Sequence, residues 1–253
     1  MPKPLSVQLY TLRDAAQKDF KAVLKVVADI GYKGVELAGT YGLKPAEFKK
    51  HLNEYNLPAI GSHVGWHEPA NAAAIIDDAK TLGYKHIVLS PPKEAFDTED
   101  GVKKLAEKLN AGTALYKKDG LVCSLHNHYW EFKDLKHSDL LTKLCPDVYW
   151  QQDIYWVQVS GQDPVKNMER YANRTVLLHV KDGPADKPES DMTAVGKGKV
   201  DIAGCLKAAE KSKAEWYSVE LDRCATDMAQ AVIDSYNYLV GNGLAAGNKP
   251  VQK

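Results

Sequence analysis

The sequence predicts a single (β/α)8 barrel. Eight short runs rich in β-branched and apolar residues alternate with helical patterns, and this alternation is typical of parallel βα units. The length of 253 residues is usual for one such barrel. Ionisable residues recur where the predicted strands end, which is where barrel enzymes build their active sites. We expect the barrel to span residues 1–240 and a flexible tail to follow over residues 241–253.

Each predicted strand is four to seven residues long. The strands are expected at Leu5–Tyr10, Gly34–Leu37, Ala59–His63, His86–Ser90, Leu121–His126, Val148–Ile154, Thr175–Lys181 and Tyr217–Leu221. Helical patterns with a period of about 3.6 residues lie between them. In Phe20–Ile30, for example, Val23, Val26, Val27 and Ile30 are expected on one face, which should pack against the outside of the barrel.

An internal echo supports a repeated βα unit. The segment Ile30–Leu37 (IGYKGVEL) recurs as Leu82–Leu89 (LGYKHIVL), 52 residues further on. Each copy reads as a helix end, a glycine stop and a strand. A doubly wound sheet is the alternative fold, but it requires a glycine-rich turn after the first strand, and Gln8–Arg13 contains no glycine.

Composition narrows the classes of function. Lys and Arg together number 33, as do Asp and Glu, so the chain has no excess of positive charge. Nucleic acid is therefore not expected as a partner. No run of about 18 apolar residues predicts a membrane span. The four cysteines lack a CxxC pair and are expected to be reduced and structural. A complete chain would be cytoplasmic, and one that has lost a leader would be exported; the sequence leaves the localisation open.

Three strands converge on metal-binding residue types. The sixth ends with Gln151 and Asp153, the seventh carries His179 and Lys181, and the eighth runs through Glu220. Side chains alternate along a strand, so one barrel interior can receive Asp153, His179 and Glu220. Carboxylate and imidazole ligands suit one Mn²⁺, Mg²⁺, Co²⁺ or Zn²⁺ ion without choosing between them. A fourth ligand is expected from the fifth strand.

The fifth strand and its exit carry the densest functional signal in the chain. His126 and His128 share a face, and Glu131 follows just beyond. Elsewhere, Glu36 at the end of the second strand is expected to contact substrate or to form a salt bridge at the mouth. His63 is a further substrate-binding candidate, and Trp156 is a candidate to stack on a substrate ring. The long connection Gly183–Asp201 is a candidate functional loop, and its segment Val195–Asp201 is expected to close over the site.

Several segments together resemble the sugar phosphate isomerase/epimerase family. They are Val7–Asp14 (VQLYTLRD), Gly31–Glu36 (GYKGVE), Leu125–Phe132 (LHNHYWEF), Leu178–Asp182 (LHVKD) and Val195–Gly198 (VGKG), and the similarity covers nearly the whole chain. The resemblance implies a xylose isomerase-like TIM barrel with one divalent metal held by a Glu, an Asp, a His and a second Glu.

The last three of these ligands map onto Asp153, His179 and Glu220. Where many members have a glutamate within the fifth strand, this chain has His126-Asn-His128. Either Glu131 curls back to the metal or His126 replaces the carboxylate, and the first alternative is preferred because it keeps the charge of the site. The metal ligands expected are therefore Glu131, Asp153, His179 and Glu220.

The implied reaction is sugar isomerisation or epimerisation by proton abstraction beside a carbonyl, through a metal-stabilised enediolate. His128 or His126 is assigned to proton transfer, with Glu131 and Glu220 as further catalytic candidates. Lys181, Gln151, Glu36, His63 and Trp156 are the substrate-binding candidates. The expected partner is a small carbohydrate, phosphorylated or not, and a homo-oligomer is possible.

Three rivals complete the sequence hypotheses. Members similar in the His-x-His-x-x-Glu segment act on 3-keto sugars and 3-keto glycosides by elimination or hydrolysis, so a lyase is the main alternative. An abasic-site endonuclease would carry a histidine three residues after Asp153, where this chain has Trp156. A non-catalytic sugar-binding barrel is disfavoured because Asp153, His179 and Glu220 are all present.

Overall fold

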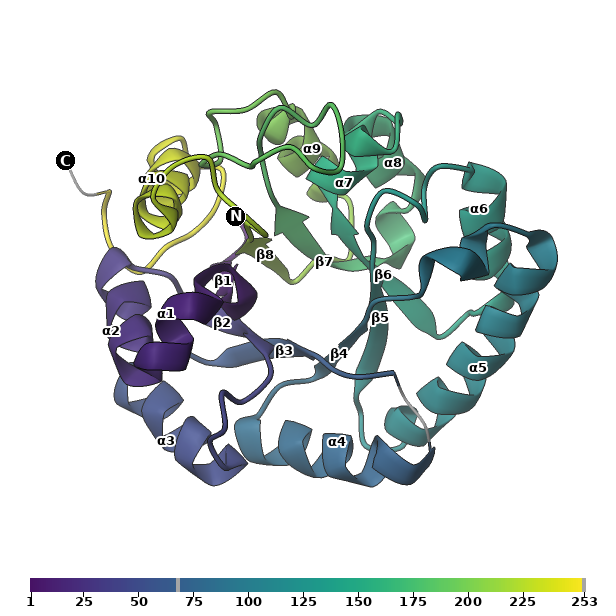
Figure 1. Cartoon of the computed structure of the whole chain (residues 1–253), viewed down its shortest axis with the longest axis horizontal. Coiled ribbons are helices and arrows are strands. Elements are labelled where there is room, and N and C mark those ends of the chain that lie inside the picture. The colour runs from purple at the N-terminus through teal and green to yellow at the C-terminus, as the bar shows by residue number, and fades with distance from the viewer. Residues whose placement is uncertain (67–68, 252–253) are drawn as a thin grey trace.

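The eight strands form a closed barrel of parallel neighbours in chain order, with the last strand pairing with the first. This computed structural model describes residues 1–66 and 69–251. The strands are β1 (Leu5–Gln8), β2 (Gly34–Ala38), β3 (Ala59–His63), β4 (His86–Leu89), β5 (Val122–His126), β6 (Val148–Asp153), β7 (Thr175–Val180) and β8 (Trp216–Val219). Figure 1 shows them as an inner ring surrounded by helices. The predicted (β/α)8 barrel is confirmed.

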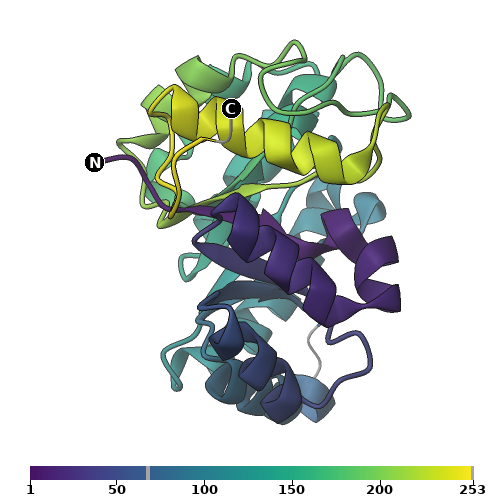
Figure 2. The ribbon, with the colours of Figure 1, turned by 90° about the vertical axis from the view of Figure 1, so that its left-hand side faces the viewer.

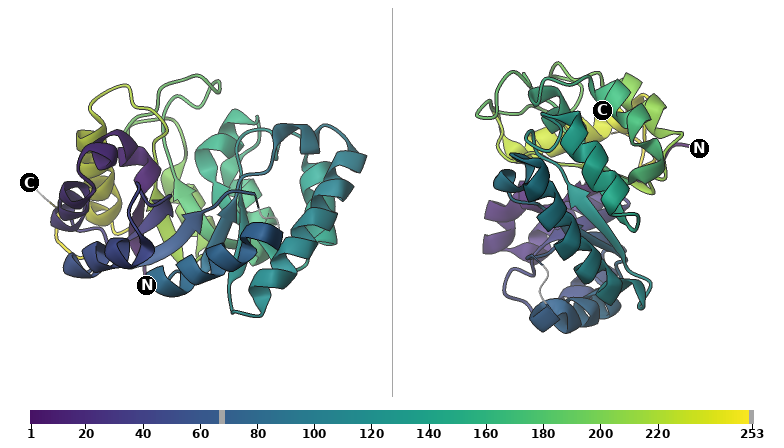
Figure 3. Two further views of the ribbon diagram at one scale, coloured as in Figure 1. Left: turned by 60° about the horizontal axis from the view of Figure 1, so that its bottom comes forward. Right: turned by 90° about the vertical axis from the view of Figure 1, so that its right-hand side faces the viewer.

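Helices cover the outside of the barrel, as the turned views in Figures 2 and 3 also show. They are α1 (Arg13–Lys18), α2 (Phe20–Ile30), α3 (Pro45–Glu54), α4 (Pro69–Leu82), α5 (Glu99–Lys117), α6 (Leu135–Leu144), α7 (Ile154–Val159), α8 (Pro164–Arg170), α9 (Ile202–Ala209) and α10 (Met228–Gly241). Three short 3-10 helices are η1 (Leu9–Leu12), η2 (Lys93–Phe96) and η3 (Ala172–Arg174). Within the described residues, no helix combines the length and apolarity needed to cross a membrane.

Two details of the predicted elements were wrong for local reasons. The first strand ends at Gln8 rather than Tyr10, because the Gln8 side chain accepts a hydrogen bond from the Tyr10 backbone N–H at 3.1 Å and η1 begins there. On α2, Val26 is 44% exposed, whereas Leu24 is buried. At about 100° per residue, Val26 lies at the edge of the face centred on Val27, so the buried stripe passes on its other side.

The repeated segments are equivalent helix stops. Gly31 ends α2 and Gly83 ends α4, both with left-handed backbones at φ 116° and 85°. Each glycine N–H returns to a carbonyl four residues earlier, which satisfies one of the last groups of the helix. A Cβ atom at Gly31 would lie 2.4 Å from the Tyr236 hydroxyl oxygen, so packing against α10 also requires glycine there.

The inside of the barrel is polar toward the C-terminal ends of the strands. The Gln151 side chain donates to Glu36 Oε1 at 2.7 Å, and its carbonyl oxygen lies 3.0 Å from His63 Nε2. These bonds connect β2, β3 and β6, which are not all neighbours, so they cross the barrel interior. The mouth of the barrel is therefore lined by hydrogen-bonding side chains that hold one another in place.

The loop between β7 and α9 is folded around one carboxylate. Asp182 is buried and accepts the backbone N–H groups of Gly183, Gly196, Gly198 and Val200 at 2.8, 2.9, 3.0 and 3.2 Å. A Cβ atom at Gly198 would lie 2.1 Å from Asp182 Oδ1, so only glycine allows this approach. The segment Gly183–Asp201 is thus an ordered loop with an internal anion at its centre.

Residues after α10 contact the N-terminal end of the barrel. The Ala246 N–H donates to the Lys3 carbonyl at 2.8 Å, and the Leu5 N–H donates to the Ala246 carbonyl at 3.0 Å. The Tyr236 hydroxyl donates to the Lys249 carbonyl at 2.6 Å. The tail that was expected to be flexible makes these contacts along β1 and α10.

All four cysteines are free thiols, and only Cys224 is partly exposed.

Replacing the central carboxylate should loosen the β7–α9 loop. In Asp182→Asn an amide nitrogen replaces one acceptor, which leaves buried N–H groups unpaired and lowers the free energy of unfolding by about 2–4 kcal/mol. Urea unfolding measures this change, and limited proteolysis should cut within residues 183–201. Asp186→Asn, an exposed carboxylate of the same loop, serves as the control and should change stability by less than about 0.5 kcal/mol. Equal stability of the two variants would contradict the role assigned to Asp182.

Candidate active site

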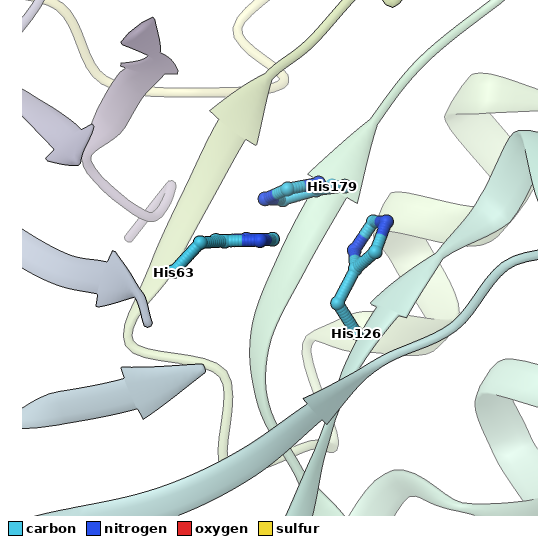
Figure 4. A group of neighbouring side chains, drawn as sticks. All are labelled: His63, His126 and His179. Carbon is cyan, nitrogen blue, oxygen red and sulfur yellow. The ribbon is translucent and has the colours of Figure 1, made fainter. Parts of the chain in front are cut away.

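Histidines from alternate strands meet at the mouth of the barrel. Figure 4 shows His63, His126 and His179 at the ends of β3, β5 and β7 with their rings turned toward one another. The ring centres of His126 and His179 are 4.8 Å apart, and the His63 and His179 rings stack at 5.7 Å with planes 17° apart. Barrel closure therefore brings together imidazoles that lie between 53 and 116 residues apart in the sequence.

Four buried side chains form a group that can hold one metal ion. His126, Asp153, His179 and Glu220 each offer a ligand atom, and these atoms lie within 4.8 Å of one another. They come from the ends of β5, β6, β7 and β8. Asn127 fixes two of these strand ends, because its side chain accepts the Asp153 N–H at 2.8 Å and donates to the Asp153 carbonyl at 3.2 Å.

The donors of this group fit a divalent cation. Asp153 Oδ2 and His126 Nδ1 are buried and make no hydrogen bond, although Lys181 Nζ lies 3.0 Å from that oxygen. Burial raises the pKa of Asp153 in spite of the nearby Lys181. Buried polar atoms without partners are costly, and a cation bound between them would satisfy both. Two oxygens and two nitrogens match the ligand set of Mn²⁺, Co²⁺ or Zn²⁺, and a carboxylate-rich setting also admits Mg²⁺.

His179 lies between two carboxylates. Its Nδ1 is 2.8 Å from Glu220 Oε2, and its Nε2 is 2.9 Å from Glu36 Oε2. Burial disfavours the imidazolium, but the charges of Glu36 and Glu220 outweigh it and raise the pKa of His179 to about 10. In turn, His179 and His63 hold the pKa of Glu36 below its ordinary range despite its burial. In the metal-free protein His179 is therefore a cation that a metal must deprotonate before it can bind there.

Lys181 supplies a second positive charge. Its Nζ lies 3.0 Å from Asp153, 2.9 Å from Glu220 and 2.8 Å from Asp222. Burial opposes the charged ammonium, but these carboxylates raise the pKa of Lys181 well above its ordinary value. Its Nζ is also 5.3 Å from the centre of the Trp156 ring. In this arrangement the ammonium faces carboxylates of the protein, so its expected contact with substrate stays a prediction.

Glu131, the preferred first metal ligand, lies outside this four-residue group. Its Oε2 accepts the backbone N–H of His128 at 2.8 Å, and its Oε1 lies 3.8 Å from His128 Nδ1. The turn after β5 therefore directs this carboxylate toward His128, and burial raises its pKa. His128 also stacks on Trp130, with ring centres 4.3 Å apart and planes 9° apart. The four-residue group therefore contains His126 and does not contain Glu131.

A hollow of about 360 Å³ opens above the group, and we call it the main hollow. Its lining consists of Gln8, Tyr10, Ala38, His63, Val64, His126, His128, Glu220 and Asp222. Of the candidates from the sequence, His126 at the end of β5, His128 just after it, His63 and Glu220 line it. The other substrate-binding candidates, Glu36, Gln151, Lys181 and Trp156, are buried and outside this lining.

Sequence reasoning missed five residues of the main hollow, of which Gln8, Tyr10 and Asp222 are polar. Gln8 is the last residue of β1 and Tyr10 lies just beyond it, with the Arg13 guanidinium 4.1 Å from the Tyr10 ring centre. Asp222 lies two residues after Glu220. The alternation of side chains along a strand, which indicates Glu220 as an interior residue, therefore indicates Asp222 as well. The sequence thus contains a pattern that indicates Asp222. The position of Tyr10 depends on the 3-10 helix η1 after β1, which the sequence analysis did not predict.

The closed barrel, with buried side chains that could hold a metal at its C-terminal mouth, places this protein in the general class of (β/α)8 barrel proteins. The chain belongs to the xylose isomerase-like TIM barrel family, whose pattern matches residues 24–239. This membership agrees with the resemblance drawn from the sequence. No match was found among curated proteins.

Three solved structures share the fold. A sugar phosphate isomerase/epimerase from Parabacteroides distasonis ATCC 8503 is 24% identical, with a TM-score of 0.79 over 97% of this chain and 96% of its own. The probable 3-DHS dehydratase AsbF from Bacillus anthracis is 13% identical, with a TM-score of 0.78 over 94% of this chain and 98% of its own. The IOLI protein with a bound zinc atom is 14% identical, with a TM-score of 0.75 over 95% and 97% of the two chains.

The charge on His179 can be tested in metal-free protein. The ring should stay protonated through pH 8 and lose its proton near pH 10, because Glu36 and Glu220 favour the cation. In Glu36→Gln one of these charges is lost, so the pKa should fall toward the ordinary value of about 6.5. Nitrogen-15 NMR of the imidazole across the pH range measures both. A neutral His179 ring at pH 7 in metal-free wild-type protein would contradict this charge assignment.

Proposed function

We propose that this protein is a divalent-metal-dependent enzyme that moves a proton at a carbon beside the carbonyl of a sugar, as a sugar isomerase or epimerase. The observation that carries the proposal is the buried group of His126, Asp153, His179 and Glu220, of which His126 and Glu220 line the main hollow together with His128. Family membership and the isomerase/epimerase among the similar structures support a carbohydrate substrate.

His126, Asp153, His179 and Glu220 are the proposed metal ligands, with His126 in place of Glu131. Their atoms lie close enough together to share one ion, and His126 and Asp153 each have a buried side-chain atom that makes no hydrogen bond. A divalent ion held there would polarise substrate oxygens and stabilise negative charge as the proton leaves. With His126 as a ligand in place of Glu131, the four ligands together carry one negative charge less. Asp222, which pairs with Lys181, supplies a further carboxylate near the group.

His128 is the proposed acid and base. Its side chain is 28% exposed and lines the main hollow, so a substrate proton can reach it. Glu131 lies within 3.8 Å of its Nδ1, and Trp130 stacks on its face, which together restrict the ring. A buried carboxylate that orients a histidine and stabilises its protonated form is a common arrangement for proton transfer. In this proposal, Glu131 acts on the reaction through His128.

Elimination from a keto-glycoside remains the alternative reaction. It begins with the same proton removal beside a carbonyl and differs only in the departure of a group from the next carbon. The same group of donors and the same histidine serve both reactions, and a probable dehydratase is among the structures with this fold. The identity of the product therefore decides between the two.

The ligand assignment predicts a difference between two variants. His126→Ala removes a proposed ligand and should weaken Mn²⁺ or Zn²⁺ affinity by roughly 100-fold or more, since losing even an outer partner typically costs 10- to 100-fold. Glu131→Gln should leave metal affinity within about threefold. Competition with a chromophoric chelator measures both constants. The reverse order of effects would return the ligand role to Glu131.

The proton-transfer assignment predicts loss of hydrogen exchange without loss of metal. Metal-loaded wild-type protein in D2O should place deuterium beside the carbonyl of a ketose, an aldose or a 3-keto glycoside, as detected by mass spectrometry and NMR. His128→Gln should lower this rate by about 10²- to 10⁴-fold, the usual contribution of a general acid or base, with metal affinity unchanged. Exchange by the variant at the wild-type rate would rule out His128 in this role. A product that has lost a substituent from the carbon next to the site of proton removal would identify the reaction as an elimination.

A further inference from the structure

A second hollow adjoins the main one. Its volume is about 300 Å³, and we call it the side hollow. It is lined by Leu37, Gly39, Thr40, Ser62, His63, Val64, Gly65, Ile75, Asp78, Leu82 and Tyr84. His63 and Val64 line both hollows, so the two spaces adjoin at this part of the β3 exit. A ligand held over the metal group would reach the side hollow by passing over the rim formed by these two residues.

The walls of the side hollow suit an uncharged group. Leu37, Ile75 and Leu82 provide an apolar surface, while Thr40 and Tyr84 add hydroxyl groups. Gly39 and Gly65 leave open space, because a Cβ atom at either position would meet no atom within 4 Å. This combination of apolar surface and a few hydroxyls is typical of sites for small organic ligands.

The lining also disfavours a phosphate. Among the described residues, neither hollow is lined by a lysine or an arginine, whereas Asp78, Glu220 and Asp222 contribute carboxylates. A phosphate placed in the side hollow would meet the carboxylate of Asp78 with no lysine or arginine in the lining to compensate for it. The nearby Lys181 is already surrounded by three carboxylates.

The usual phosphate-binding position of such barrels is also filled. In many (β/α)8 enzymes, backbone N–H groups of the loops after the seventh and eighth strands hold a substrate phosphate. Here the amides of Gly196, Gly198 and Val200 donate to the carboxylate of Asp182. The chain thus satisfies its own glycine-rich loop with an internal anion, and these donors are not free for a ligand.

We propose that the side hollow is a second substrate subsite that takes an uncharged ring joined to the sugar in the main hollow, and that it does not take a phosphate ester. The inference rests on the proposed function for the sugar in the main hollow. It adds the class of compound recognised, which is an unphosphorylated sugar bearing a second sugar ring or an aromatic ring.

Two matched series of compounds test the subsite. The first compares D-fructose with isomaltulose, which carries glucose on O6, and with fructose 6-phosphate. The second compares D-glucose with phenyl β-D-glucoside and glucose 1-phosphate. Calorimetry with Mn²⁺-loaded protein should give at least tenfold tighter binding of a two-ring compound than of its one-ring parent, and weaker binding of the phosphate ester. Preference for isomaltulose or for the phenyl glucoside identifies the ring as a sugar or an aromatic group.

A pair of neighbouring residues supplies the matched variants. Ile75→Phe fills the side hollow and should abolish the two-ring advantage while leaving parent binding and Mn²⁺ affinity unchanged. Ile76→Phe, at the next position of α4, is not part of the lining and should change neither. If Ile75→Phe fails to fold, Thr40→Trp at the loop after β2 takes its place, with the same expected result.

Several outcomes would overturn the subsite. One is a parent that binds while neither two-ring compound binds more tightly. A second is that a phosphate ester binds most tightly of its series. A third is that the two-ring compounds keep their tighter binding in Ile75→Phe and Thr40→Trp. A fourth is that none of the six compounds binds. Mn²⁺ affinity and deuterium exchange decide the proposed function separately, so failure of the subsite is distinguishable from failure of the metal site.

Discussion

The balance of buried charge at the barrel mouth is the constraint on which the rest of the site depends. Glu36, Asp153, Glu220 and Asp222 contribute carboxylates there, and Lys181 and His179 are the cations in contact with them. Burying a charge is costly unless it is paired, so these side chains must face one another closely. Two cations do not neutralise four carboxylates, and a bound divalent ion that displaces the His179 proton brings the group nearer to neutrality.

This balance explains why different parts of the chain serve one end of the barrel. Closure of the sheet brings together the ends of β2, β5, β6, β7 and β8, which carry the charged residues, while Gln151 and His63 cross-link the interior through Glu36. Asn127 holds the end of β6 against the exit of β5. The loop after β7 is folded separately, around Asp182, so its glycines serve the structure of the loop. The buried group of His126, Asp153, His179 and Glu220 therefore lies where strands end, and two of its members line the main hollow.

The sequence predicted the barrel and three members of the buried four-residue group because both follow from short-range rules. Alternation along strands placed Asp153, His179 and Glu220 on the interior, and each belongs to the buried group. The choice between Glu131 and His126 depends on the turn after β5, where a hydrogen bond from the His128 N–H to Glu131 directs the carboxylate, and no periodicity reports such a bond. The partners of Lys181 and the bonds from Glu36 to His63 and His179 depend on closure of the whole barrel, so they could not be read from any single segment.

The central claim is that one divalent ion binds to His126, Asp153, His179 and Glu220. Anomalous diffraction from crystals of the Mn²⁺-loaded protein, recorded at the manganese absorption edge, tests it most directly. The account predicts a single peak within about 2.0–2.6 Å of one atom from each of these four side chains, and Glu131 still bonded to the His128 backbone. A peak that includes a Glu131 oxygen and excludes His126, or a peak away from the barrel mouth, would contradict it.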